Sequence, residues 1–238
     1  MKSNILCIFE GEVREHKYFK SVESNFFNNK NILKCSYGND IFELYKDIEK
    51  DSDLDIVELI RESDTIPKNK ELLSGLERDD INQVYLFFDM ECHDNDYSSI
   101  KLLKMIDFFC EETDNGKLFI SYPMIESIRD ILEYNNFIRH TVTIDDCKNY
   151  KHISSQGRLK DFQDPRKIDA DKWKKLIWHT VLKVNTIVYN STEFPKRCPE
   201  QALLLKGQIK HMEQYNAVYI VSSFPIFIYH QFGIKLFE

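Results

Sequence analysis

The sequence predicts an α/β fold: a central parallel sheet flanked by helices, followed by a mostly helical C-terminal extension. Two observations lead to this prediction. Apolar runs of strand length alternate with helical patterns through the first two thirds of the 238 residues. No hairpin turn joins consecutive strands, so we expect parallel strands with a helix in each connection.

Two predicted strands open the chain. The run Ile5–Phe9 predicts the first, and a helix follows it through Phe26. Asn31–Tyr37 predicts the second, and Asp40 is expected to cap a helix over Ile41–Glu49. The first strand is apolar throughout, which is typical of a strand buried on both faces. The run SDLDIVELIRE predicts a further helix.

Two more strands follow. The stretch 63–82 contains a proline and a glycine and is expected to be an exposed insertion. NQVYLFFD, residues 82–89, is the strongest predicted strand because it is rich in β-branched and aromatic side chains. A helix is predicted over 98–112 and a strand over 117–122, KLFISY. Pro123 is expected to begin another helix, MIESIRDILEY.

The pattern changes beyond residue 147. Ala170–Tyr189 predicts a long amphipathic helix, and PEQALLLKGQIKHMEQY predicts another. The apolar run AVYIVSSFPIFIYHQFG fits either a strand or a buried helix. We therefore divide the chain into an α/β domain, residues 1–146, and a basic, mainly helical extension, residues 147–238, packed on it.

Composition narrows the class of protein. With 42% hydrophobic and 30% charged residues, the chain has the composition of a globular protein. It contains no long apolar run and no signal-peptide pattern, so we expect a cytoplasmic protein without a membrane partner. The six cysteines form no C-x-x-C pair and are expected to be buried free thiols. Cys92-His93 is a weak candidate for a soft-metal pair.

Charge is distributed unevenly. Residues 1–147 carry 17 Lys and Arg against 31 Asp and Glu, a balance of −14. Residues 148–186 carry 10 against 4, a balance of +6. An acidic body with one basic segment favours a protein that holds an anion on a restricted surface. The alternative is a solvated basic helix face.

Acidic side chains follow three predicted strands at their carboxyl ends. Glu10 closes the first strand, Asp89 and Glu91 close the third, and Glu126 follows the fourth. The carboxyl ends of parallel strands share one edge of the sheet, where such sheets bind ligands. Asp89 and Glu91 are two residues apart, so they are expected on one side of an extended chain. Gly11 is expected to let the backbone turn sharply after the first strand.

Such a cluster requires a compensating charge. Two unit charges ~4 Å apart repel by about 4 kcal/mol at an effective dielectric constant of about 20. Mg²⁺ is held in proteins by a few carboxylates and keeps other positions for water and phosphate oxygens. The sequence therefore predicts a divalent-cation site with a phosphate behind it. Solvated or capping roles stay open, above all for Glu12, Asp94 and Asp96.

These segments resemble the Toprim fold, the catalytic domain of topoisomerases, bacterial primases and overcoming-lysogenization-defect nucleases. ILCIFEGEVREHKYF resembles its first motif, an apolar strand that ends in a catalytic Glu before Gly. VYLFFDMECHD resembles its second motif, a strand that ends in D-x-D. YPMIESI and YGNDIFELYKDI are similar to segments of the small RloB-like and AriB-like phage-defence proteins. The resemblance covers roughly residues 4–135.

The resemblance implies a role for each acidic residue. Glu10 would be a metal ligand or general acid/base at the scissile phosphate, Asp89 and Glu91 would bind Mg²⁺ or Mn²⁺, and Glu126 would help to hold a second ion. Glu12, Asp94 and Asp96 rank lower, as outer ligands. Glu91 departs from the motif because it replaces an aspartate and reaches one methylene further.

Arg158 and Lys183, both in the basic segment, are weaker candidates for contacts to the substrate, with an ordinary surface role as the alternative. The motifs give little guidance for residues after 147, where the extension would bind a substrate or a partner.

The resemblance implies a metal-dependent phosphodiesterase: a nuclease acting on DNA or RNA, including tRNA, as the toxic effector of bacterial antiviral defence by abortive infection. The alternative is a regulatory or partner-binding Toprim subunit controlled by a separate ATPase or sensor protein. The chain itself contains no Walker-type G-x-x-x-x-G-K-S/T motif, which favours a separate ATPase. A third and weaker possibility is a small-molecule phosphohydrolase.

Overall fold

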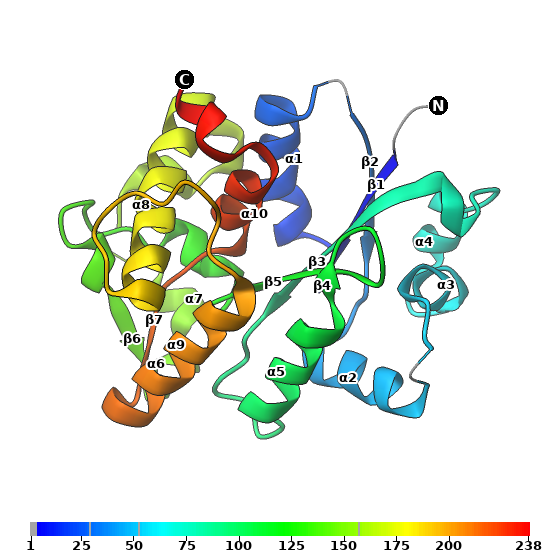
Figure 1. The fold of residues 1–238 in the computed structure, drawn as a ribbon, viewed down its shortest axis with the longest axis horizontal. Helices are drawn as coiled ribbons and strands as arrows, with labels where there is room; N and C mark the ends of the chain where they lie inside the picture. Colours follow the sequence, from blue (N-terminus) through cyan, green and yellow to red (C-terminus); the bar gives the residue numbers. More distant parts are fainter. Residues whose placement is uncertain (1–3, 29, 52, 157) are drawn as a thin grey trace.

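Five strands form the central sheet in the order β2-β1-β3-β5-β4 (Figure 1). We describe a computed structural model of residues 4–238, with positions 29, 52 and 157 left out. The strands are β1 (Asn4–Phe9), β2 (Asn31–Ser36), β3 (Ile81–Asp89), β4 (Cys110–Glu111) and β5 (Gly116–Ser121). All neighbours are parallel except the short edge strand β4. The predicted α/β class with a mostly parallel sheet is confirmed.

Helices cover both faces of this sheet. The α-helices of the described chain are α1 (Arg14–Phe26), α2 (Ile41–Lys50), α3 (Ile56–Glu62), α4 (Pro67–Leu72), α5 (Ser99–Phe108), α6 (Ile144–Cys147), α7 (Tyr150–Ile153), α8 (Ala170–Tyr189), α9 (Gln201–Tyr215) and α10 (Ser223–Phe232). In Figure 1, α1 and α10 lie on one side of the sheet and α2 and α5 on the other. The cap predicted at Asp40 is confirmed, because its carboxylate accepts from the backbone N–H groups of Phe42 and Glu43.

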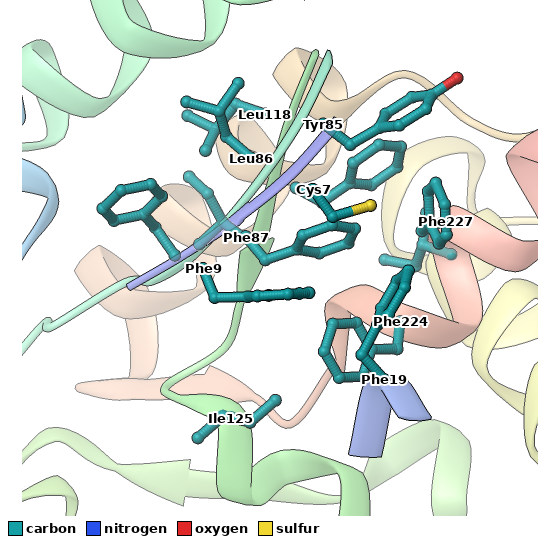
Figure 2. Packing of buried hydrophobic residues seen from close by; sticks show 14 of the residues in the cluster. Cys7, Phe9, Phe19, Tyr85, Leu86, Phe87, Leu118, Ile125, Phe224 and Phe227 are labelled. Carbon is teal, nitrogen blue, oxygen red and sulfur yellow. The ribbon is translucent and has the colours of Figure 1, made fainter. Parts of the chain in front are cut away.

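The core beside α1 and α10 is aromatic. Phe9 and Phe87, from neighbouring strands, stack with ring centroids 5.3 Å apart. Phe224 and Phe227 of α10 each lie 5.1 Å from Phe87, and Phe19 of α1 completes the group. Figure 2 shows these rings packed together under the sheet. Alternate strand residues thus point to this face, and the opposite residues fill the core beneath α2 and α5.

The C-terminal segment is part of the same core. Helix α8 has the predicted bounds, and its buried face packs on α10. A second, two-stranded sheet joins β6 (Thr141–Thr143) to β7 (Ala217–Tyr219), and Val221 bridges to Tyr122 just beyond β5. The predicted boundary between residues 146 and 147 falls inside α6. The division into two domains stays an interpretation. In the described part of the chain, no helix is long and apolar enough to cross a membrane.

The stretch 63–82 is largely exposed, as predicted, but three of its side chains anchor it to the sheet. It contains α4, and its Ile66 and Leu73 are buried. Asn69 is the physical reason, because its side chain accepts from the backbone N–H of Ser36 and donates to the Ser36 carbonyl. The side-chain amide thereby satisfies an edge residue of β2 as a neighbouring strand would. The stretch closes one edge of the sheet.

Two predicted helices are shorter than expected. The helix predicted over 98–112 ends at Phe108, because the next residues form β4 and pair with β5. After Pro123 there is only a 3₁₀ segment, Ile125–Arg129. The buried carboxylates of Glu126 and Asp130 each meet an arginine from another segment, and these tertiary ion pairs override the local helical preference.

The apolar run near the C-terminus was expected to be either a strand or a buried helix, and it contains one of each: the strand β7 followed by the helix α10. The expectation of buried thiols is wrong for Cys110, which is exposed at the sheet edge, and Cys198 is only partly buried. The other four thiols are buried, as predicted.

Candidate metal centre

Three carboxylates predicted from the sequence converge at the carboxyl edge of the sheet. One oxygen each of Glu10, Asp89 and Glu91 lies within 4.8 Å of the other two. The register explains the convergence: Phe9 of β1 pairs with Phe87 of β3, so the residues that follow the two strands leave the sheet side by side. Among the described residues this is the one cluster with metal-ligand geometry.

The backbone fixes Glu10 and Asp89 relative to each other. Glu10 continues the ladder beyond β1, because its N–H donates to the Phe87 carbonyl (3.0 Å) and its carbonyl accepts from Gly38 (2.9 Å). Its side-chain Oε2 accepts the N–H of Asp89 at 2.9 Å. Asp89 is only 7% exposed. Both carboxylates are therefore held by rigid strand ends.

Glu91 reaches the cluster by a different route from the one predicted. The chain does not stay extended after Asp89, because Glu91 has φ +50°, in the left-handed region. Such a conformation costs a non-glycine residue roughly 1–2 kcal/mol. Met90, between the two ligands, donates its N–H to the carbonyls of Ser121 and Pro123 at 3.0 and 3.1 Å. The bend places Glu91 beside Glu10, and local backbone strain of this kind is concentrated at functional sites.

Burial and mutual repulsion disfavour the ionised forms. Burial, followed by the nearby carboxylates of Glu91 and Glu15, raises the pKa of Glu10 from 4.5 to about 8, against the hydrogen bond from Asp89. Burial and the Glu10 charge raise the pKa of Asp89 well above its ordinary value. Burial also raises the pKa of Glu91, although His93 and Lys151 oppose the shift. The cluster is thus short of positive charge.

Glu15 is a fourth carboxylate that the sequence analysis missed. It is buried in the first turn of α1 and raises the pKa of both Glu10 and Asp89. A Cβ atom at position 11 would lie 3.0 Å from Glu15 Oε2. Gly11 leaves room for the Glu15 carboxylate, and the backbone bends between β1 and α1, as expected. The pattern E-G-E-x-x-E carries the signal, because its last carboxylate begins the helix.

Glu126 lies next to the cluster but outside it. Its carboxylate is buried and forms an ion pair with Arg14 of α1, whose side chain is 41% exposed. The neighbouring residue Ile125 lies close to the site, since its backbone N–H favours the ionised form of Asp89 and lowers the pKa of that group. The structure thus gives Glu126 a cationic protein partner, and its role in holding a second ion stays a prediction.

The lower-ranked residues are spread over the surface. Glu12, Asp94 and Asp96 are exposed, and Asp96 lies 3.5 Å from Lys46. Neither weaker substrate candidate has a free charge on the surface. Arg158 pairs with buried Asp130, and Lys183 is fully buried and donates to the His140 carbonyl at 2.6 Å.

Cys92 and His93 do not form the soft-metal pair that was considered. His93 Nε2 is 3.6 Å from Glu91 Oε2, whereas Cys92 Sγ points to Cys147 Sγ at 3.5 Å. The two side chains therefore face different partners.

The donor set fits a hard divalent cation. Three carboxylates supply only oxygen ligands, and a cation between them would offset the burial and the repulsion from nearby carboxylates that disfavour their ionised forms. Comparisons with protein-family models, curated proteins and solved structures gave no match. The assignment of function therefore depends on these residues alone.

Proposed function

We propose that the protein is a Mg²⁺- or Mn²⁺-dependent phosphodiesterase of Toprim type that cuts nucleic acid. The convergence of Glu10, Asp89 and Glu91 at the ends of two adjacent parallel strands carries the proposal. Parallel α/β sheets bind their ligands just beyond the carboxyl ends of the strands, and these three carboxylates lie there. The order of the motifs along the chain, E-G-E before D-x-E, supports the same conclusion.

Each of the three carboxylates has its own role in the proposed site. Asp89, on a strand end and deeply buried, is the most rigid ligand, and Glu91 is held beside it by the bend after β3. Glu10, with a pKa of about 8 in the metal-free site, is suited to accept or donate a proton near neutral pH. A bound divalent cation would neutralise charge on a phosphate oxygen and lower the pKa of a coordinated water.

Cleavage assays test the proposal. Purified protein is incubated with plasmid, single-stranded DNA and total tRNA, with Mg²⁺ or Mn²⁺ or with a chelator. We expect metal-dependent cleavage of at least one substrate. Asp89→Asn should reduce the rate by at least about 100-fold, as does loss of one electrostatic contact at a reaction centre. Asp96→Asn removes the same charge from the exposed loop and should keep the wild-type rate.

Equal rates for wild type and Asp89→Asn would contradict the proposal. A model diester and a model monoester separate the phosphohydrolase alternative, because a small-molecule phosphatase would prefer the monoester. The role as a toxic defence effector, and control by a separate ATPase, stay predictions from the sequence. Growth arrest on expression of wild type, absent with Asp89→Asn, would support the first.

A further inference from the structure

A basic cavity of about 680 Å³ opens beside the acidic cluster. Its wall carries five cationic side chains and one carboxylate: Arg14, Lys17, Lys20, Arg129, Arg166 and Asp164. The lining balance of +4 contrasts with −14 for residues 1–147 as a whole. Local charge of this sign in an acidic protein concentrates anions at one place on its surface.

Three of these cations have no carboxylate partner among the residues that the structure describes. Lys17 and Lys20 are exposed on α1, and the Arg129 guanidinium donates to Ser154 Oγ and the Lys151 carbonyl. Arg166, in contrast, forms a bidentate pair with Asp164, with both distances 2.9 Å. Lys17, Lys20 and Arg129 therefore supply the charge that an incoming anion would neutralise.

Arg14 joins this cavity to the acidic cluster. It lines the cavity and pairs with Glu126, the residue after Ile125, whose backbone N–H lowers the pKa of Asp89. The next residue of α1, Glu15, is buried against the same cluster. The first turn of α1 therefore faces the cavity on one side and the three carboxylates on the other.

We infer that this cavity binds the sugar-phosphate backbone of a nucleic-acid strand and leads it to the acidic cluster. That the nucleic acid leads to the acidic cluster rests on the proposed function, whereas its binding in the cavity requires only the cationic side chains. The lining offers no stacking surface for bases, because its one aromatic residue, Tyr18, is buried and donates to the Phe162 carbonyl. Recognition is therefore of phosphates and independent of sequence.

The cavity draws its charge mainly from outside the basic segment. The sequence analysis favoured an anion held by residues 148–186, with a partner or a solvated helix face as alternatives, but only Arg166 among the lining cations belongs to that segment. The others come from α1 and from the 3₁₀ segment after β5. Counting charges along the sequence could not show that α1 and the 3₁₀ segment, which are distant in sequence, supply most of the positive charge of the cavity.

Binding without cleavage tests the inference. In the Asp89→Asn background, with chelator, the fluorescence anisotropy of labelled single-stranded DNA and RNA of equal length is measured from 50 to 300 mM salt. Three phosphate contacts predict a slope of about −2 to −3 for log K against log salt. Lys17→Gln with Lys20→Gln should lower the slope magnitude by about 1.5 and the affinity several-fold at the lowest salt.

The matched control is Lys206→Gln with Lys210→Gln, two exposed lysines of α9, which packs against α5. That pair should bind like the parent, and Lys17→Arg with Lys20→Arg should restore binding. Equal losses for the two Gln pairs, or no loss for the α1 pair, would overturn the inference. Because binding is measured without metal or cleavage, an inactive enzyme that still binds through α1 would refute the proposed function and leave this inference standing.

Discussion

The backbone N–H of Asp89 donates to Oε2 of Glu10 across 2.9 Å, so the two principal carboxylates of the acidic cluster are linked through the ends of neighbouring strands. The bond stabilises Glu10 in its ionised form, but burial has the larger effect on its pKa. The same geometry that fixes the ligands therefore stores electrostatic repulsion in the metal-free protein.

Stability without metal should fall as pH rises. The pKa of Glu10 is about 8 in the folded protein and 4.5 ordinarily, so between these values the unfolded chain loses its proton first. This contribution to stability is complete below pH 4.5 and is lost as pH rises through 8. In the presence of a chelator, the melting temperature of Glu10→Gln minus that of wild type should increase from pH 5 to pH 8.

The amide of Glu10→Gln keeps an oxygen for the Asp89 N–H, so the variant should fold normally. Glu12→Gln, an exposed neighbour, serves as the control and should run parallel to wild type at every pH. Parallel curves for Glu10→Gln as well would show that Glu10 titrates normally in the folded protein.

Divalent ions should raise the melting temperature. Binding to the folded state alone stabilises it by about 2.7 kcal/mol at a hundredfold excess over Kd. We expect a clear rise with Mn²⁺ and a smaller one with Mg²⁺, which gives up its water reluctantly. Asp89→Asn should lose most of the rise, and Asp96→Asn should keep it. Diffuse binding to the acidic surface would instead give both variants the wild-type rise.

The left-handed conformation of Glu91 should be visible in stability. Glycine adopts φ +50° without a steric penalty, so Glu91→Gly should be more stable than Glu91→Ala by about 1 kcal/mol in urea unfolding. Both variants should lose cleavage. Asn190, with φ +52° at the end of α8, offers the comparison: Asn190→Gly should exceed Asn190→Ala in stability, and both should cleave normally. An Ala variant as stable as Gly at position 91 would argue against the bend.

The ion pair between Arg14 and Glu126 should matter for stability. Arg14→Ala leaves a buried carboxylate without its partner, which costs on the order of 1–3 kcal/mol. Adding Glu126→Gln removes that charge and should recover part of the loss, as a double-mutant cycle would measure. Glu126→Gln alone should keep the metal-induced rise in melting temperature. Loss of that rise would identify Glu126 as a metal ligand.

The sequence could predict what local pattern controls. The continuous apolar runs indicated β1 and β3, and the amphipathic spacing gave α8 its observed bounds, Ala170–Tyr189. Parallel strands then implied that Glu10 and Asp89 would meet. These conclusions need only the period of the side chains and the direction of the strands.

Long-range pairing controls the rest. The arginines that pair with Glu126 and Asp130 come from distant segments. Local sequence does not predict these ion pairs, or the 3₁₀ segment that stands where a helix was expected. Glu91 sits in a conformation that its residue type disfavours, so propensity pointed away from it. Glu15 looked like an ordinary first-turn acid of a helix until α1 was placed against the sheet.

The position of α10 in the aromatic core has a consequence for biosynthesis. Glu10, Asp89 and Glu91 all precede β5 in the chain, yet Phe224 and Phe227 pack against the strands that carry them. At about 5–20 residues per second, synthesis from β5 to α10 takes on the order of ten seconds. Until α10 leaves the ribosome, the rings of Phe9 and Phe87 lack their cover. Under the proposed function, the acidic cluster would therefore reach its final packing only once α10 has been made and covers these strands.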